Sequence, residues 1–403
     1  MTMTFRPERP RKLLPRLLAA ALFLGAGIIP RAASAAQPVR AGDETRSSSA
    51  AAPNGTVRVG VFGLFRPIEL LVRPVRGSVL LIRAGAETWA LDDEEQAHLR
   101  VVDRLVECST SRRTVRAPVV RVTQRSHDPL SGDLVLAVPG KIARRFRGTL
   151  EVTASAEGEA GLDGGDAPRT TLLPVVTMKL EVAVASTVAA ESAGDSGIEA
   201  LKAQAVATRA YYVAARGRHK GFDFCDTTHC QFLRSPPAPA APASVATRAT
   251  SGLILTYRGA PLAALYSASC GGRTRTLAAV GMLVSDPRGY PYFAVDCPYC
   301  REHARAWSVR IDDPGPDTGA LLREGVSSES ARLRVARQVG WSVLPGNGYE
   351  LSSEGNAVLV HGRGAGHGVG LCQEGAQGMA EAGADFRAIL RHYYPNTQIV
   401  AAN

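Results

Sequence analysis

Short apolar runs separated by turn residues fill the first half of the chain from Thr56 onward. Each run is rich in Val, Ile and Leu and is bounded by Gly, Pro or charged residues. Runs of this kind between turn signals are typical of β-strands. Residues 56–180 are therefore predicted to be a β-rich N-terminal region. The clearest runs are residues 56–62, 68–72, 78–82, 118–122 and 134–138.

Helical patterns appear in the second half of the chain. Residues 198–215 place Ile198, Leu201 and further apolar or small side chains on one side at helical spacing, which makes this the strongest predicted helix. The predicted fold class is therefore α+β, with a mixed helical and β part at residues 181–400. Further elements expected there are a hairpin of residues 253–257 and 261–267 across Arg258-Gly259, and helices at 376–382 and 385–394 on either side of Gly383.

The first 35 residues have the layout of a secretory signal peptide. A basic stretch ends at Arg16, an apolar run covers residues 17–29, and small residues precede an expected cleavage site near Ala35. The apolar run is too short to span a bilayer, which takes about 20 residues. Residues 36–55 lack an apolar period and are predicted to be a disordered leader. We expect a protein secreted to the periplasm or cell wall, with no transmembrane segment after cleavage.

The charge of the chain agrees with a protein that is only mildly basic. Its 403 residues carry a formal net charge of +10. The predicted signal peptide holds six basic residues and one acidic residue, so its removal leaves +5. This balance excludes an acidic disordered chain and does not identify a nucleic-acid binder, so no nucleic-acid partner is predicted.

Seven cysteines are present, and four thiol or imidazole groups fall within twelve residues. These are His219, Cys225, His229 and Cys230. Such a group suits tetrahedral zinc, and because all four ligands come from the protein, the site would be structural. The alternatives are a Cys225–Cys230 disulfide or two unrelated thiols, since disulfides form in secreted proteins.

A second sulfur group contains Cys270 and the pair Cys297 and Cys300, with His303 close by. A disulfide from Cys270 to one of the pair, such as Cys297, is the preferred prediction, and a second metal site is the alternative. A redox role for the Cys-x-x-Cys pair has no supporting βαβ context. Cys372 is expected to be a small buried thiol.

Three further stretches together carry a resemblance. The first is Glu191 followed by Glu199-Ala-Leu-Lys-Ala-Gln-Ala-Val-Ala, the second runs from Ala264 through Ser-Ala-Ser-Cys-Gly-Gly to Thr274, and the third is Gly364-Ala-Gly-His-Gly-Val-Gly-Leu-Cys-Gln-Glu-Gly-Ala376. Each is weakly specific alone, but their order and separation resemble the SpoIID/LytB family of stage II sporulation protein D and amidase enhancers. The resemblance covers most of the chain from about Thr56.

The resemblance implies binding of peptidoglycan glycan strands and, in the sporulation branch, lytic transglycosylase activity. It places the catalytic glutamate on Glu191. It also implies a glycan-binding groove in the C-terminal part, and some family members hold a zinc ion in a loop similar to residues 219–230. The chain departs from the family at Ser192-Ala193 and Ser196-Gly197, where Met-Pro and Trp-Pro are frequent, and at Cys372, where the family usually has Ser.

A single carboxyl group is enough for this chemistry. In a lytic transglycosylase the 6-hydroxyl of the substrate attacks the anomeric carbon, so Glu191 would serve first as acid and then as base, helped by a pKa raised in apolar surroundings. The alternative is that Glu191 is a solvated acid between two helices, the second capped by Asp195 or Ser196.

Six further side chains are candidates for substrate binding. His367 lies among four glycines, which allow turns with positive φ and close approach of another group. The alternative for His367 is a local hydrogen bond that fixes the turn. The predicted substrate-binding residues are Lys202, Arg209, Tyr266, Ser267, His367 and Gln373.

The sequence therefore predicts a secreted lytic transglycosylase that cleaves the MurNAc–GlcNAc β-1,4 bond with formation of 1,6-anhydro-MurNAc. One alternative is a non-catalytic glycan-binding protein that enhances a peptidoglycan amidase. Another is a zinc hydrolase that uses Cys225 and His229, although the chain has no His-Glu-x-x-His motif and offers four ligands rather than three.

Overall fold

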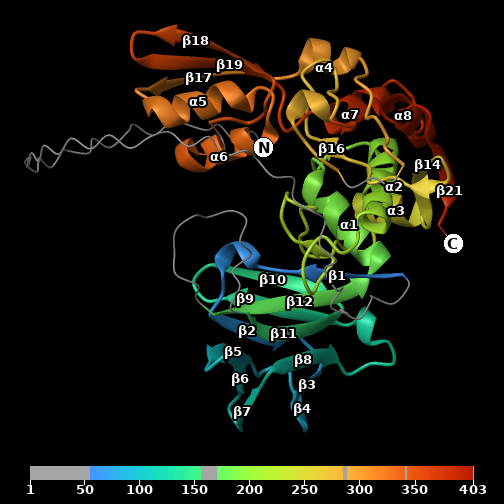
Figure 1. Cartoon of the computed structure of the whole chain (residues 1–403). Coiled ribbons are helices and arrows are strands. Elements are labelled where there is room, and N and C mark those ends of the chain that lie inside the picture. Colours follow the sequence, from blue (N-terminus) through green and yellow to red (C-terminus); the bar gives the residue numbers. More distant parts are fainter. Residues whose placement is uncertain (1–54, 156–169, 285–287, 341–342, 403) are drawn as a thin grey trace, which may run out of the picture. The chain divides into compact units, whose positions relative to one another are not determined.

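The computed structural model describes residues 55–155, 170–284, 288–340 and 343–402 (Figure 1). The predicted signal peptide and residues 36–54 of the predicted leader lie outside the described residues. Strands predominate in the chain as far as Lys179, and helices with further strands follow, which confirms the predicted α+β class.

The β-rich region forms two sheets. Neighbouring strands pair in antiparallel fashion, except that β13 lies parallel to β1 and adds a short segment of the later chain to the first sheet. The first sheet has the order β13 (Phe224–Cys225), β1 (Thr56–Gly60), β12 (Thr171–Lys179), β11 (Thr149–Ser155), β8 (Val119–Gln124), β3 (Leu80–Ala84) and β4 (Glu87–Leu91). The second has the order β10 (Ile142–Arg147), β9 (Asp133–Val138), β2 (Glu69–Pro74), β5 (Ala97–Val102), β6 (Leu105–Ser109) and β7 (Thr114–Ala117).

One hydrophobic core joins both sheets to the first two helices. In β3, alternate residues Leu80, Ile82 and Ala84 are buried, as expected for strands that turn one face to a core. The same core contains Val188 of α1 (Leu180–Glu191) and Tyr212 of α2 (Ile198–Ala214). The end of α1, where Glu191 lies, is thus anchored to the β-rich region by apolar burial.

A second core surrounds α2 on its other side. Figure 1 shows α2 beside α1 and α3 (Pro242–Ala249), and contacts join it to α7 (Gln373–Glu381) and α8 (Phe386–Tyr393). The predicted hairpin is formed in part: β14 (Leu253–Tyr257) is as expected, but the second strand, expected at 261–267, is only the short β15 (Ala260–Pro261). The remaining strands here are β21 (Gln398–Ala401), which pairs with β14, and β16 (Tyr266–Ser267), which lies parallel to β20 (Leu371–Cys372).

Residues 298–363 contain elements that the sequence patterns did not predict. An antiparallel sheet packs with two helices around Leu322, Val335 and Val360. The elements are α4 (Pro298–His303), β17 (Ala306–Asp312), α5 (Gly315–Gly325), α6 (Glu329–Val339), β18 (Tyr349–Glu354) and β19 (Ala357–Arg363). Short 3-10 turns elsewhere are η1 (Gly63–Phe65), η2 (Pro129–Ser131) and η3 (Ala278–Val280).

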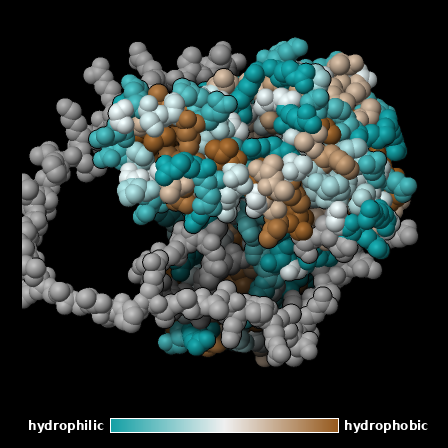
Figure 2. Space-filling model, turned by 45° about the horizontal axis from the view of Figure 1, so that its top comes forward, coloured by the Kyte–Doolittle hydropathy of each residue, from teal (hydrophilic) through white to brown (hydrophobic). Residues whose placement is uncertain are grey.

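The surface carries its hydrophobic side chains in separate groups. On the face shown in Figure 2, brown groups are set among hydrophilic residues. Large hydrophobic side chains that are well exposed include Leu64, Ile68 and Leu283. Within the described part of the chain, no helix combines the length and apolar character of a membrane span.

Candidate active site

Glu191 is the last residue of α1 and is half-buried. Its backbone ends the helix, and α2 begins only after an intervening turn, with Gly197 as its N-cap rather than the expected Asp195 or Ser196. Position at a helix end fits either interpretation of Glu191, so its environment decides between them.

Burial and a hydrogen bond define that environment. The backbone N–H of Phe232 donates a hydrogen bond to Oε1 of Glu191 over 3.0 Å. Burial raises the pKa of Glu191 to about 7, although the hydrogen bond from Phe232 acts in the opposite direction. A carboxyl group with a pKa near 7 can donate and accept a proton at neutral pH, which is what a general acid and base requires.

Tyr266 lies within electrostatic range of this carboxyl group. Burial raises the pKa of Tyr266, and the charge of Glu191 raises it further. The Tyr266 hydroxyl donates to Oε1 of Gln231 over 2.7 Å. Gln231 and Phe232 are consecutive, so one short segment orders both the tyrosine and the carboxyl group.

Gln373 approaches Glu191 from another element. As the first residue of α7, it directs its Nε2 to the backbone carbonyl of Glu191 over 3.1 Å. The preceding strand β20 pairs with β16, which carries Tyr266 and Ser267. The structure therefore brings Glu191 and Gln373 together, although they are 182 residues apart in sequence. Tyr266 and Ser267 belong to the same neighbourhood through the pairing of β16 with β20.

The glycine-rich loop packs closely against the backbone of residues 265–269. Gly364 and Gly370 have φ of 79° and 75°. A Cβ at Gly370 would lie 1.9 Å from the carbonyl oxygen of Leu265, and one at Gly364 would lie 2.6 Å from that of Ser269. The group that passes near this loop is the segment that carries Tyr266 and Ser267, so the glycines are needed to build the site.

His367 makes the local contacts that fix this turn. The backbone N–H of Val369 donates to Nδ1 of His367 over 3.0 Å, and the imidazole also bonds the backbone of Tyr266. Burial lowers the pKa of His367, which favours the neutral ring. The alternative role of His367 as a turn-fixing residue thus has direct contacts, while its role in binding substrate stays a prediction.

Ser267 and Lys202 occupy different settings. The Oγ atom of Ser267 is buried and has no hydrogen-bond partner among the described residues. Lys202 lies on α2 and forms an ion pair with Glu199 over 2.6 Å, where both side chains are partly exposed. Glu199 in turn accepts from the backbone N–H of Phe386, so the pair ties α2 to α8.

Arg209 was also predicted to bind substrate, but the structure places its side chain in the core at 0% exposure. Its Nε and Nη2 atoms each donate to a carboxylate oxygen of Glu181 over 2.7 Å. Nη1 donates to the carbonyl of Leu253 over 2.9 Å, and Nη2 to that of Thr247 over 3.2 Å. These bonds link α1, α2, α3 and β14, which is a structural role.

Replacement of Arg209 by Met is therefore expected to destabilise the fold by about 3–5 kcal/mol, because it leaves buried carbonyls without donors. Chemical denaturation of the purified protein measures this free energy. Lys202→Ala is the matched control on the same helix and should cost less than about 1 kcal/mol, since its ion pair is partly exposed. Equal losses for the two variants would contradict the structural role of Arg209.

The four predicted metal ligands converge. The donor atoms of His219, Cys225, His229 and Cys230 all lie within 4.8 Å of one another. Nε2 of His219 is 3.1 Å from Sγ of Cys230, and Nδ1 of His229 is 3.7 Å from each of the two sulfurs. The ring of Phe222 stacks on His219 and backs the group.

This donor set fits a tetrahedral metal ion. Zinc bound by two sulfurs and two nitrogens keeps its ligand atoms roughly 3.3–3.8 Å apart, close to the separations found here. The group lies directly before Gln231 and Phe232, the residues that contact Tyr266 and Glu191. A metal held here would fix the segment that orders the candidate acid.

All seven cysteines are free thiols in the structure. The expected disulfide between Cys270 and Cys297 is therefore not formed, and neither is the alternative Cys225–Cys230 disulfide. Cys372 is buried as expected, but it is not isolated, since its Sγ lies 3.4 Å from that of Cys300. The fold brings Cys270, Cys297, Cys300 and Cys372 together as a group of four, which sequence spacing could not predict.

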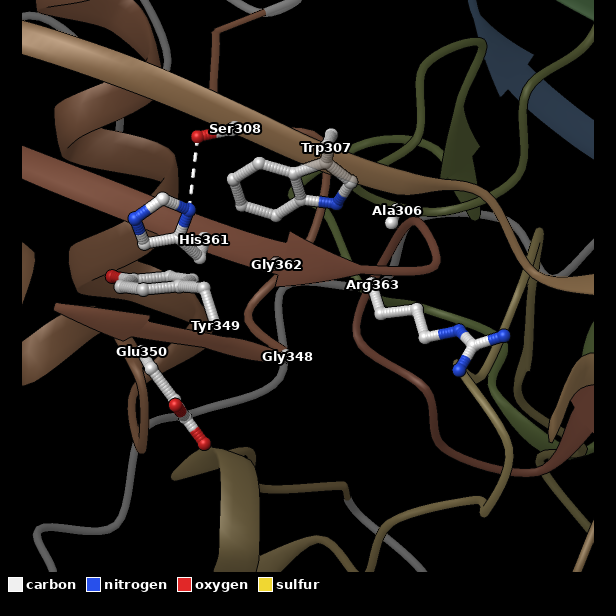
Figure 3. A pocket seen from close by; sticks show the side chains of 9 residues that line it. All are labelled: Ala306, Trp307, Ser308, Gly348, Tyr349, Glu350, His361, Gly362 and Arg363. Carbon is white, nitrogen blue, oxygen red and sulfur yellow. Dashed lines mark hydrogen bonds between the residues drawn. The ribbon is translucent and has the colours of Figure 1, made fainter.

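A pocket of about 600 Å³ lies elsewhere, on the sheet of β17, β18 and β19 (Figure 3). Its lining includes Trp307, Tyr349 and His361, with His361 bonded to Ser308 over 2.9 Å, and does not include Glu191. Nε1 of Trp307 donates to the carbonyl of Gly364 over 2.9 Å. This side of the pocket thus supports the start of the glycine-rich loop.

Sequence reasoning missed two residues of the site. Gln231 could have been noticed because it follows directly on the Cys/His group. Phe232 acts through its backbone N–H, so its side-chain identity carries no signal for that contact.

The comparisons with known proteins agree with the resemblance. Residues 169–257 match the family SpoIID, described as stage II sporulation protein, and this segment contains Glu191 and the Cys/His group. A stage II sporulation protein D of Bacillus subtilis is 28% identical over 273 residues, which is 58% of this chain and 78% of that protein.

Two further relatives are similar to this chain. An uncharacterized protein of Brachyspira hyodysenteriae is 28% identical over 262 residues, covering 58% of this chain and 70% of that protein. An amidase enhancer of Bacillus subtilis is 32% identical over 76 residues, covering 19% of this chain and 10% of that protein.

Proposed function

Because the chain belongs to the SpoIID/LytB family, we propose that it is a lytic transglycosylase that cleaves the glycan strands of bacterial peptidoglycan. The observation that carries this proposal is the setting of Glu191. It is a half-buried carboxyl group whose pKa is raised to about 7 by burial and which accepts a hydrogen bond from the backbone N–H of Phe232, while Gln373 bonds the backbone carbonyl of the same residue.

The reaction needs one group that gives and then takes a proton. Protonated Glu191 donates its proton to the oxygen of the MurNAc–GlcNAc β-1,4 bond, and the bond from that oxygen to the anomeric carbon breaks. The 6-hydroxyl of MurNAc attacks the same carbon, and the carboxylate of Glu191 accepts the hydroxyl proton. The products are a strand that ends in 1,6-anhydro-MurNAc and a strand with a free GlcNAc 4-hydroxyl, so no water is consumed.

The protein's own residues have positioning roles in this scheme. Phe232 N–H orients the carboxyl group, and Tyr266 is held beside it by Gln231. The group of His219, Cys225, His229 and Cys230 would hold a structural zinc ion, which supplies cross-linking of the loop rather than chemistry at the substrate, since no position is left open for water.

The place of action follows from the proposed substrate. Peptidoglycan lies outside the cytoplasmic membrane, so the proposal includes export by the predicted signal peptide at residues 1–35. The residues around Glu191 would then meet glycan strands in the periplasm or cell wall.

A second function is favoured by one observation, the match to an amidase enhancer. In that case the chain binds glycan strands and stimulates a separate peptidoglycan amidase without cleaving the strands itself. The same fold would serve, and Glu191 would not determine any product.

The test is mass spectrometry of the fragments released from peptide-free and peptide-bearing glycan strands by the protein and by its Glu191→Gln variant. We expect 1,6-anhydro ends from the unmodified protein alone. The two substrates show whether stem peptides must first be removed.

Other products lead to other conclusions. Reducing ends would indicate hydrolysis and overturn the transglycosylase mechanism. Binding of both substrates without cleavage, together with faster release of stem peptides by an added amidase, would establish the enhancer function instead.

A further inference from the structure

A second group of sulfur atoms is separate from the Cys/His group that begins at His219. Sγ atoms of Cys270, Cys297, Cys300 and Cys372 all lie within 4.8 Å of one another. Three of these residues are buried and Cys270 is half-buried. They come from separate segments: the loop after β16, the start of α4, and the junction of β20 with α7.

We propose that these four cysteines form a second metal site, a tetrathiolate that binds zinc. In a tetrahedral zinc site of four sulfurs the ligand atoms lie roughly 3.8 Å apart, and Cys300 and Cys372 are already at 3.4 Å. Binding exchanges four thiol protons for one Zn²⁺ ion and changes no oxidation state. The inference does not depend on the proposed cleavage activity.

The surroundings supply donors for thiolate sulfur. The backbone N–H groups of Cys270 and Gly375 point to Sγ of Cys372 over 3.3 and 3.4 Å. The hydroxyl of Tyr393 lies 3.2 Å from Sγ of Cys297. Donors of this kind stabilise the negative charge of metal-bound sulfur, and Cys372 also caps the N-terminus of α7, where the helix dipole favours an anion.

Gly375 leaves room for the sulfur of Cys297 because it has no side chain. A Cβ at Gly375 would lie 2.4 Å from Sγ of Cys297 and 2.0 Å from the hydroxyl of Tyr393. Glycine at this position of α7 is therefore needed for the group to assemble. Sγ of Cys300 lies 3.8 Å from a carboxylate oxygen of Glu374, to which the thiol donates until metal binding removes its proton.

The site would hold in place a residue that contacts Glu191. Cys372 is followed directly by Gln373, whose Nε2 bonds the carbonyl of Glu191. In the first group, Cys230 is followed by Gln231 and Phe232, which contact Tyr266 and Glu191. Each sulfur group thus precedes residues that contact the candidate acid or its neighbour.

Metal analysis of the purified protein tests the proposal without any activity assay. We expect about two zinc ions per chain in the unmodified protein, and about one in Cys372→Ser and in Cys225→Ala. Serine can still cap α7, so Cys372→Ser removes a ligand with little change to the helix. Cys108→Ala removes a buried thiol outside both groups and should keep both ions.

Two further measurements decide the identity of the site. With cobalt in place of zinc, a site of four thiolates should show stronger thiolate-to-cobalt charge-transfer absorption than the site of two cysteines and two histidines. Cys372→Ser should remove this stronger absorption, and Cys225→Ala should retain it. The intact mass under denaturing, non-reducing conditions should equal that of the fully reduced chain, because each disulfide would remove two hydrogen atoms. Disulfides among the four cysteines, iron in place of zinc, or equal zinc in Cys372→Ser and unmodified protein would overturn the proposal.

Discussion

Replacement of Glu191 by Gln is expected to lower the rate of glycan cleavage by about 10²- to 10⁴-fold, the usual contribution of a general acid and base. The introduced amide would keep the size of the side chain and an oxygen for the Phe232 hydrogen bond, but it has no acidic proton to give to the glycosidic oxygen. Release of 1,6-anhydro products from purified strands measures the rate. A rate within about threefold of the unmodified protein would contradict the proposed mechanism.

The same variant is expected to be more stable than the unmodified protein above pH 7. The folded-state pKa of Glu191, about 7, lies above the ordinary value of 4.5. Between these values the folded state holds a proton that the unfolded state has lost, so the contribution of Glu191 to stability is full below about pH 4.5 and is lost as pH rises through 7. Because the group is half-buried, we expect a gain of about 1–2 kcal/mol at pH 8 and none near pH 4.5.

Glu199→Gln is the matched control for this effect. Burial acts to raise the pKa of Glu199, but its bonds to Lys202 and to the backbone N–H of Phe386 outweigh burial and hold the pKa below its ordinary value. Its contribution is therefore present above pH 4.5, so Glu199→Gln should lose stability at pH 8. Thermal unfolding at pH 4.5 and 8 compares the two variants. The same sign for both would show that the raised pKa of Glu191 does not determine its stability effect.

Local sequence patterns were sufficient for elements whose stabilising contacts are close in sequence. The helix predicted at 198–215 is α2 (Ile198–Ala214), and the Arg258-Gly259 turn joins β14 to β15. The break at Gly383 has φ of 89° and separates α7 from α8, as expected for a residue without a side chain. In each case the apolar spacing or the turn residue is itself the physical cause.

Long-range contacts account for what the sequence did not reveal. Arg209 was predicted to bind substrate, but its guanidinium donates to Glu181 and to the carbonyl of Leu253 in the core. Cys372 is 102 residues from Cys270, so no local spacing announces that their sulfurs meet. The sheet of β17–β19 likewise depends on residues 306 and 363 pairing across a long connection.

The group of His219, Cys225, His229 and Cys230 is expected to hold Glu191 in position without contacting the substrate. Cys225→Ala should bind one zinc ion fewer than the unmodified protein. Zinc at a free concentration about 1,000-fold above its Kd adds about 4 kcal/mol to stability, and the variant should lose most of this. Because the loop then no longer fixes Phe232, kcat should fall by about 10- to 100-fold, with a smaller change in KM.

Thr227→Ala separates loss of the metal from loss of a neighbouring contact. Thr227 lies 3.2 Å from Sγ of Cys225 and bonds the backbone N–H of His229, but it is not one of the four ligands. The Thr227→Ala variant should keep its zinc and most of its kcat. The loop has other anchors, namely the pairing of β13 with β1 and the ion pair of Arg144 with Asp226 over 2.9 Å. These should keep Cys225→Ala folded, so a variant that lost zinc and retained full kcat would show that the metal does not position Glu191.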